Sequence, residues 1–272
     1  FYAAPQSRKI TYSKLLPNLG VTYKFNDKAS LFTSYAKNLS VPGTDALYGA
    51  LYFDEDSSSG QPKPETSDAF DLGFRYQSGI IQAQLSGWYT RYNNRLASAY
   101  DADCDCTVTR NLGRVDKYGV DGSVAVRPVK DLMFYVFGSY LKSEIKDDVQ
   151  TSATAYAETA GKREAGAPTY TFGGRIQGTL GPVDLGLQVK RTGERYVNDI
   201  NTVKLPGYTL VDLDARFSLA QFGLEKTFFQ LNVTNLFDKV YIGYSGTSLT
   251  GTSGTAYLGA PRAISGSMVV AF

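Results

Sequence analysis

The sequence predicts an all-β protein, a transmembrane antiparallel β-barrel with about eleven strands in its 272 residues. Apolar and polar residues alternate along many segments, as they do in strands with one apolar face. No apolar run approaches the roughly 18 residues that a membrane-spanning helix needs. The last segment alternates in the same way and ends on Phe272, as expected of a strand that closes a barrel in lipid.

The composition excludes several classes of protein. The sequence has 20 Tyr and 15 Phe but only 2 Cys and no His, and its net charge is +2. Without His, neither Ser-His-Asp nor Cys-His catalysis can operate within these residues, nor can His ligate zinc or haem. We therefore expect no enzyme, no cofactor and no metal site. The small net charge gives no reason to expect a nucleic-acid partner.

Eleven segments show the alternation that is typical of strands. In chain order they are Leu19–Phe25, Lys28–Lys37, Ser67–Gln77, Ile80–Leu96, Val115–Arg127, Leu132–Ile145, Thr169–Thr179, Val183–Arg195, Tyr208–Leu219, Thr227–Leu236 and Arg262–Phe272. The pattern is clearest in the third segment, where Phe70 and Phe74 share one face and Asp71 and Arg75 share the other.

The segment Tyr208–Leu219 shows why a membrane barrel fits better than a soluble β-sandwich. Leu213 and Phe217 share one face, and Asp214 and Arg216 share the other. Inside a sandwich such charges would be buried without partners, whereas on the wall of a barrel lumen they meet water. We therefore assign the charged face to the lumen and the apolar face to lipid.

The connections between these segments are alternately short and long. The short ones lie near residues 26, 78, 128, 181 and 223, and the long ones span 38–66, 97–114, 146–168, 196–207 and 237–260. Short periplasmic turns and long external loops distinguish the two ends of barrels in the bacterial outer membrane. We therefore expect the protein to lie in the bacterial outer membrane. No signal peptide is visible at residues 1–5, so we also expect that Phe1 is not the start of the translated protein.

Four groups of residues, in order along the chain, resemble motifs of the TonB-dependent outer-membrane receptors. They are Lys63–Ser67 with Leu72–Tyr76, Asn111–Gly113 with Tyr118–Asp121, Asn232–Asp238 with Tyr241, and Tyr257–Arg262 with the terminal Phe272. No single motif is specific, but their order and spacing cover nearly the whole chain. The resemblance identifies the family.

The resemblance implies that residues 1–272 form the C-terminal part of a receptor barrel, about half of its 22 strands. It implies no plug domain within the chain, so that contact with the TonB complex is made through a plug elsewhere. Two alternatives stay open: the missing strands lie upstream, or residues 1–16 add a twelfth strand to a smaller pore. The family likeness further implies that the barrel assembly machinery recognises Phe272.

By the same resemblance, the protein is expected to import a scarce nutrient across the outer membrane with energy from TonB. A ferric siderophore is the commonest cargo of the family, which makes iron transport the first expectation. Carbohydrate or cobalamin uptake is the alternative within the family. A passive porin-like barrel is the alternative outside it.

The candidate ligand-binding residues are aromatic and Arg side chains in the long external connections: Tyr48, Tyr52, Tyr100, Arg110, Arg163 and Tyr196. Aromatic rings beside Arg donors suit an anionic ligand with aryl groups, such as a ferric siderophore. They suit a sugar stacked on Tyr equally well. Some of these aromatic residues are alternatively part of the girdle at the lipid interface.

The segment 101–106 contains three Asp and both Cys of the chain. Its spacing excludes an EF-hand, because Cys106 stands where Gly is required and Leu112 where Glu is required. A looser calcium site remains an alternative. We expect a disulfide between Cys104 and Cys106, although one intervening residue makes its ring strained.

Three further expectations are structural. Glu65 is expected to pair with a neighbouring cation of the lumen, and Asn235 and Asp238 are expected to cap the exit of a strand into a loop. The charged side chains of the lumen face are expected to pair with one another or with the plug.

Overall fold

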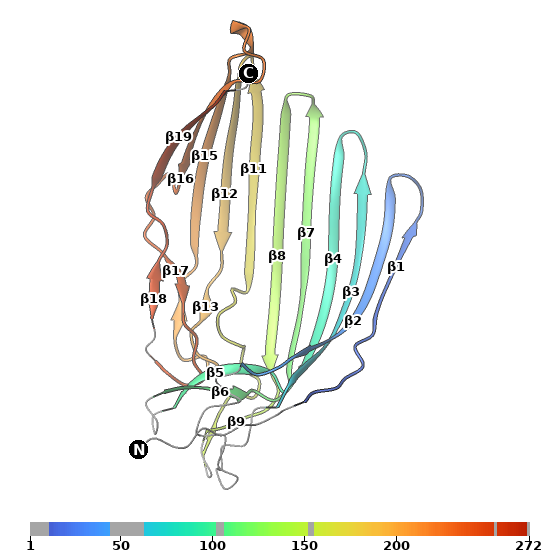
Figure 1. Cartoon of the computed structure of the whole chain (residues 1–272), viewed down its shortest axis with the longest axis vertical. Helices are drawn as coiled ribbons and strands as arrows, with labels where there is room; N and C mark the ends of the chain where they lie inside the picture. Colours follow the sequence, from blue (N-terminus) through green and yellow to red (C-terminus); the bar gives the residue numbers. More distant parts are fainter. Residues whose placement is uncertain (1–10, 44–62, 102–105, 152–154, 253–254, 271–272) are drawn as a thin grey trace.

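The computed structural model describes residues 11–43, 63–101, 106–151, 155–252 and 255–270. One antiparallel sheet of eleven strands dominates it, and its spatial order follows the sequence (Figure 1). Its strands are β1 (Asn18–Lys24), β2 (Ala29–Ser40), β3 (Glu65–Gln77), β4 (Ile81–Asn93), β7 (Val115–Val129), β8 (Leu132–Ile145), β11 (Tyr170–Leu180), β12 (Val183–Thr192), β15 (Tyr208–Ser218), β16 (Phe228–Thr234) and β19 (Ala263–Val269). All eleven predicted strands are confirmed.

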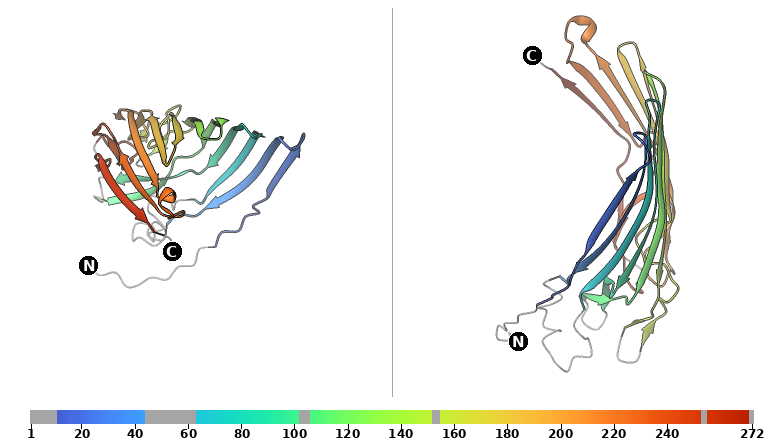
Figure 2. Two further views of the ribbon diagram at one scale, coloured as in Figure 1. Left: turned by 90° about the horizontal axis from the view of Figure 1, so that it is seen from above. Right: turned by 90° about the vertical axis from the view of Figure 1, so that its right-hand side faces the viewer.

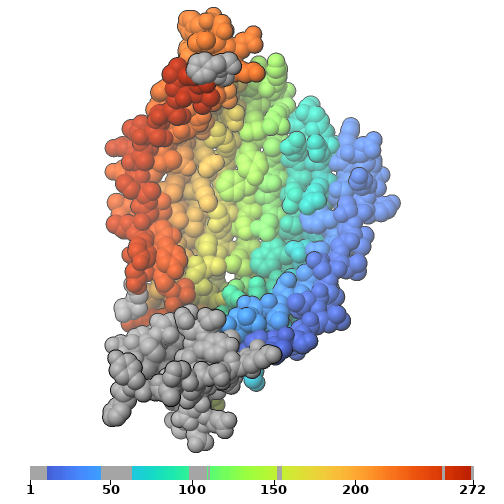
Figure 3. Space-filling model, in the orientation of Figure 1, coloured from blue at the N-terminus to red at the C-terminus, as the bar shows by residue number. Residues whose placement is uncertain are grey.

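The sheet is strongly curved and forms part of a barrel wall. Seen from above, its strands follow an arc that is open on one side (Figure 2). Neighbouring strands lie side by side without a break from β1 to β19, in the colour order of the sequence (Figure 3). No helix in the described residues is long and apolar enough to span a membrane.

The register keeps like side chains together across the wall. Leu213 of β15 lies between Leu187 of β12 and Val233 of β16, so three apolar residues share one face. Asp214 points to the other face, where Arg175 of β11 donates to both of its carboxylate oxygens at 2.7 and 2.9 Å. This confirms the predicted alternation. We call the two sides the apolar face and the polar face.

The long connections contain short hairpins that the sequence did not predict. Within the part of the chain that the structure describes, four two-stranded sheets lie at the loop end of the wall, opposite the short turns (Figure 1). They pair β5 (Leu96–Asp101) with β6 (Cys106–Asn111), β9 (Val149–Gln150) with β10 (Tyr156–Ala157), β13 (Arg195–Tyr196) with β14 (Lys204–Leu205), and β17 (Ile242–Ser245) with β18 (Ala256–Leu258).

Two of the predicted strands extend beyond a turn at the loop end of the wall. The segment predicted as Ile80–Leu96 divides at Asn94, whose φ of 53° cannot continue a strand but is tolerated by Asn. The segment predicted as Val183–Arg195 ends at Thr192, and Arg195 belongs to the separate hairpin of β13 and β14. The chain turns at both places to form the loop-end hairpins.

Candidate functional site

A small apolar core holds the loop end together. Its buried side chains come from the ends of β7 and β8 and from three of the long connections: Leu112, Val115, Ile145, Val149, Ala157 and Leu249. Leu249 follows β17, far along the chain from the others, so this core joins connections that are distant in sequence. In a one-layered sheet most side chains cannot be covered, and the loop end is where connections return over the wall and bury apolar area.

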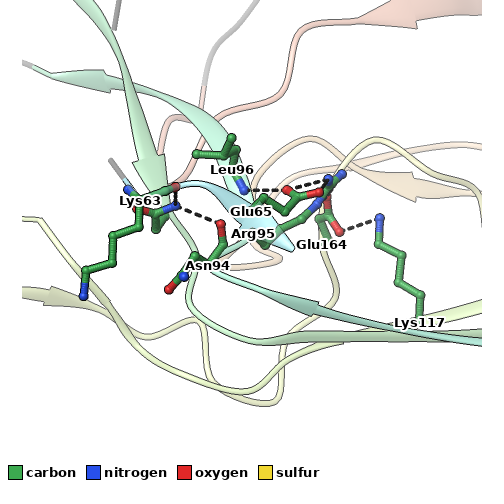
Figure 4. A network of polar contacts seen from close by, with 8 residues as sticks. Lys63, Glu65, Asn94, Arg95, Leu96, Lys117 and Glu164 are labelled. Atoms are coloured by element: carbon green, nitrogen blue, oxygen red, sulfur yellow. Dashed lines mark hydrogen bonds and ion pairs between the residues drawn. The ribbon is translucent and has the colours of Figure 1, made fainter. Parts of the chain in front are cut away.

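A network of partly buried charges, drawn in Figure 4, also lies at the loop end. Arg95, which follows β4, contacts Glu65 of β3 at 3.0 Å and Glu164 of the β10–β11 connection at 2.9 Å. Glu164 also contacts Lys117 of β7 at 2.6 Å. The backbone N–H of Leu96 donates to Glu65 at 2.8 Å. The expectation that Glu65 pairs with a neighbouring cation is confirmed.

Asn111, the first residue of the motif Asn111–Gly113, joins the ends of neighbouring loops through hydrogen bonds to their backbone. Its side-chain amide nitrogen donates to the carbonyls of Lys63 at 3.0 Å and Asn94 at 2.8 Å, and its oxygen accepts from the N–H of Lys63 at 2.8 Å. Gly113 follows with a φ of +69°, and a Cβ there would lie 2.5 Å from Asp147. A side chain at position 113 would therefore push this part of the loop end apart.

The predicted caps after β16 are confirmed. Asn235 and Asp238 both have positive φ angles, which Asn and Asp adopt more readily than other residues. The Asn235 amide donates to the carbonyls of Lys239 and Ala260 at 3.0 and 3.1 Å. Asp238 accepts from the N–H of Arg262 at 2.8 Å. The motif thus shapes the exit from the strand.

Asp199 is a buried carboxylic acid within the loop end. It accepts from the N–H of Ala165 at 2.8 Å, and its own N–H donates to the carbonyls of Ser248 and Leu249 at 3.1 Å each. Burial, and to a smaller extent the charge of Glu164, raise the pKa of Asp199 to about 6. The hydrogen bond from Ala165 opposes that rise most strongly, and the charges of Lys117 and Arg95 oppose it to a smaller extent.

The buried Asp199 predicts that the loop end loses stability as the pH rises. The folded state holds the proton up to about pH 6, whereas the unfolded chain releases it near 3.8. Stability from this group is therefore full below pH 4 and is lost through pH 6, by up to about 3 kcal/mol. Asp199→Asn, which keeps the acceptor for Ala165, should raise the loop-end stability at pH 7 and flatten this profile.

The measurement for Asp199 is the free energy of local opening for residues 163–168, obtained from amide exchange at pH 4 to 7 after correction for the intrinsic rates. Equal pH profiles for the wild type and Asp199→Asn would contradict the prediction.

A pocket of about 420 Å³ lies on the polar face next to this assembly, at the loop ends of β11, β12 and β15. Its polar and aromatic lining includes Lys190, Thr192, Arg195, Tyr208, Tyr244 and Ser245. This volume is within the range of small-molecule sites, and such sites combine apolar rings with a few placed donors. The ammonium group and hydroxyls can donate to the oxygens of a ligand.

Arg195 joins the hairpin of β13 and β14 to β17 beside the pocket. It is 6% exposed, and its guanidinium donates to the carbonyl of Ile242 at 2.9 Å. The ring of Tyr208 packs against that of Tyr241, with centroids 4.4 Å apart and the ring planes at 37°. These contacts fix two sides of the pocket, so that its shape is built into the fold.

The structure brings together two of the six predicted ligand-binding residues. The guanidinium of Arg163 lies 5.9 Å from the ring centroid of Tyr196, and Tyr196 adjoins the pocket residue Arg195. The carbonyl of Tyr196 also accepts from Gly166, which lines the pocket. Arg163 and Tyr196 therefore lie at the edge of the pocket.

The other predicted site residues are described in part or not at all. Tyr100 lies in β5, Arg110 and Cys106 lie in β6, and only their backbone positions are described. Tyr48, Tyr52 and Cys104 lie outside the described residues, as does Phe272. The disulfide therefore stays a prediction. Among the described residues, no three His, Cys, Asp or Glu side chains gather as a metal site would require.

The sequence did not single out the pocket residues Lys190, Thr192, Tyr208, Tyr244 and Ser245 as ligand-binding. Three of them could have been found from the sequence. Lys190, Thr192 and Tyr208 fall on the polar face in the alternation of their strands and stand next to a long connection. Tyr244 and Ser245 gave no such signal, since the position of β17 beside β12 and β15 is a tertiary feature.

Comparison with known proteins agrees with this architecture. A family model described as TonB dependent receptor-like, beta-barrel matches residues 2–236. The ferrioxamine receptor of Yersinia enterocolitica is 26% identical over 222 residues, which cover 79% of this chain and 29% of that receptor. The ferrichrome outer membrane transporter/phage receptor of Escherichia coli K12 is 23% identical over 228 residues, covering 82% of this chain and 28% of that protein.

A solved structure has the same fold. The ferric yersiniabactin uptake receptor FyuA from Yersinia pestis superposes with a TM-score of 0.67 over 92% of this chain and 36% of FyuA, at 20% sequence identity. The chain spans less than a third of the length of the ferrioxamine and ferrichrome receptors named above. The match of the family model across most of the chain, with the eleven-stranded wall, shows that the chain belongs to the TonB-dependent receptor β-barrel family of the Gram-negative outer membrane.

Proposed function

We propose that this chain forms part of the barrel of an outer-membrane receptor that imports a ferric siderophore with energy from TonB. The observation that carries the proposal is the pocket on the polar face, which in a barrel is the lumen, at the loop end where cargo enters. The names of the relatives, ferrioxamine and ferrichrome receptors, support a siderophore as the cargo.

The pocket offers what an oxygen-rich iron chelate requires. Lys190 and Thr192 are donors for oxygen atoms, and the rings of Tyr208 and Tyr244 give apolar area. Arg163 and Tyr196 extend this surface at its edge. We propose that Tyr48, Tyr52, Tyr100 and Arg110 add contacts from the neighbouring connections. Transport rather than catalysis is the role of this site.

We further propose that residues 1–272 are the C-terminal part of the barrel, and that a plug elsewhere in the protein contacts TonB. The relatives are more than three times as long as the matched region, which supports this arrangement. In the same proposal the barrel assembly machinery recognises Phe272.

The cargo is tested by deletion of the gene in cells grown under iron limitation. We expect induction of the gene by iron starvation and loss of growth on one ferric siderophore, with growth on other iron sources preserved. Expression that ignores iron and follows a sugar or cobalamin would contradict the siderophore and favour the alternative cargo.

Lys190→Gln tests the pocket itself. We expect it to weaken the binding of the ferric siderophore to the full receptor by about tenfold, the loss of one charged hydrogen bond worth about 1.4 kcal/mol. Lys226→Gln, an exposed Lys beside the short turn before β16, is the matched control and should bind like the wild type. Equal affinity for Lys190→Gln and the control would exclude Lys190 as a cargo contact.

A further inference from the structure

The apolar face carries a compact group of charges at the loop end of β4, β7 and β8. One row of register neighbours across these strands is aromatic and ends in a cation. Tyr89 lies opposite Tyr118, and Tyr118 lies opposite Lys142. The same row continues to Phe70 of β3, which is half-exposed on the apolar face. On each of these strands the residue two positions closer to the loops is charged. The face therefore changes from aromatic to charged within two residues along a strand.

Five charged side chains follow this aromatic row. In the register of the sheet, Arg91 lies opposite Asp116, and Asp116 lies opposite Glu144. One step further, the N–H of Lys146 donates to the carbonyl of Arg114 at 2.8 Å, which extends the same two strands. The outer-face cluster is defined by these residues with the cation of the aromatic row: Arg91, Arg114, Asp116, Lys142, Glu144 and Lys146.

The outer-face cluster has two more cations than carboxylates. Three of its cations surround Asp116, with Arg91 at 3.5 Å, Lys146 at 3.9 Å and Arg114 at 4.0 Å. These distances exceed the roughly 2.7–2.9 Å of a charged hydrogen bond, so Asp116 holds these cations only weakly. Arg91 donates to the hydroxyl of Tyr89 at 3.1 and 3.2 Å, and Lys146 donates to Glu144 at 2.5 Å. The side chains of Arg91 and Arg114 are 49% and 47% exposed. The cluster therefore presents partly exposed cations and excess positive charge.

The position of the cluster fixes its surroundings. Its residues share the face that meets lipid, and aromatic side chains such as Tyr89 and Tyr118 mark the border of the hydrocarbon region in membrane barrels. The long connections are on the external side, so the cluster lies at the level of the lipid head groups of the outer leaflet. Anionic lipids accumulate at clustered Lys and Arg, and a guanidinium binds phosphate with two parallel hydrogen bonds.

We propose that the outer-face cluster is a binding site for the phosphorylated head group of a lipid in the outer leaflet. The acyl chains of that lipid lie along the apolar face of β4, β7 and β8, and its phosphate takes the donors of Arg91, Arg114, Lys142 and Lys146. Asp116 and Glu144 space the cations and reduce their mutual repulsion. The site is on the opposite face of the wall from the pocket, so it is independent of the cargo.

The test uses native mass spectrometry of the full receptor in mild detergent with added lipid A, a phosphorylated outer-leaflet lipid, in its diphosphorylated and dephosphorylated forms. We expect the wild type to retain the diphosphorylated form at least tenfold more tightly than the dephosphorylated form. Lys142→Gln with Lys146→Gln should remove that preference, and inorganic phosphate at millimolar concentration should leave the bound lipid in place. Displacement by inorganic phosphate would overturn the lipid as the occupant.

Two further variants separate binding from folding. Asp116→Asn removes a competing carboxylate and should tighten the binding of diphosphorylated lipid A severalfold, a gain that misfolding cannot produce. Arg127→Gln with Lys130→Gln removes two cations at the turn end of β7 and should bind lipid like the wild type. Unchanged lipid binding in the Lys142 and Lys146 double variant, or an equal loss in the turn-end control, would overturn the proposal.

Discussion

Leu213→Arg is expected to abolish the stable insertion of this protein into the outer membrane. Leu213 is near the middle of β15 on the apolar face, between Leu187 and Val233. A cation there faces the hydrocarbon region and costs roughly 2–4 kcal/mol near the middle of the bilayer. Phe217→Arg should cause a smaller loss, because position 217 is close to the turn end of the strand and an Arg can reach the head groups.

The measurement is the yield of folded, heat-modifiable protein in outer-membrane fractions. Asp214→Asn is the matched control, since it is the next residue along the same strand and belongs to the polar face. It breaks the pair with Arg175, but both groups remain partly exposed, so the loss is at most about 1 kcal/mol. If Asp214→Asn and Leu213→Arg reduced the folded yield equally, the assignment of the two faces would be wrong.

Arg95→Ala is expected to open the loop-end assembly while the eleven-stranded wall stays intact. The guanidinium is the shared partner of Glu65 and Glu164, and both carboxylates are largely buried. Removal of one partner from a buried ion pair leaves charges without compensation and costs about 3–5 kcal/mol. Lys117 still contacts Glu164, so the greater loss should appear around Glu65.

Amide exchange is the measurement for this variant, because the N–H of Leu96 donates to Glu65 and reports on the network directly. We expect much faster exchange for Leu96 and for residues 160–168, with unchanged protection in the middle of β7 and β8. Lys204→Gln removes the exposed pair with Glu194 and should leave both regions as they are. Equal protection of Leu96 in the wild type and in Arg95→Ala would show that the network does not stabilise the loop end.

The wall could be predicted from sequence because one physical constraint acts along its full length. Each strand meets lipid on one side and the lumen on the other, so a segment such as Tyr208–Ser218 repeats the same alternation over many residues. The loop-end hairpins are too short for this signal. Arg195–Tyr196 contains two residues, and its pairing with Lys204–Leu205 depends on contacts from elsewhere in the chain.

The candidate site was predictable only in part for a related reason. Residue type and position in a long connection were sufficient to select Arg163 and Tyr196, which lie together at the edge of the pocket. The pocket itself is formed where residues of β17 lie beside the ends of β12 and β15, and the sequence pattern contains no information about that proximity. Glu65 and Asn235 were predictable because their roles are local to the end of a strand.

The most direct test of the proposed function is iron uptake by cells whose only route for a given siderophore is the full receptor. A radiolabelled ferric siderophore of the ferrioxamine or ferrichrome type is supplied to these cells. We expect saturable uptake that stops when the proton-motive force is dissipated and that is weakened by Lys190→Gln. Uptake that neither saturates nor depends on the proton-motive force would contradict an energised receptor and identify a passive pore.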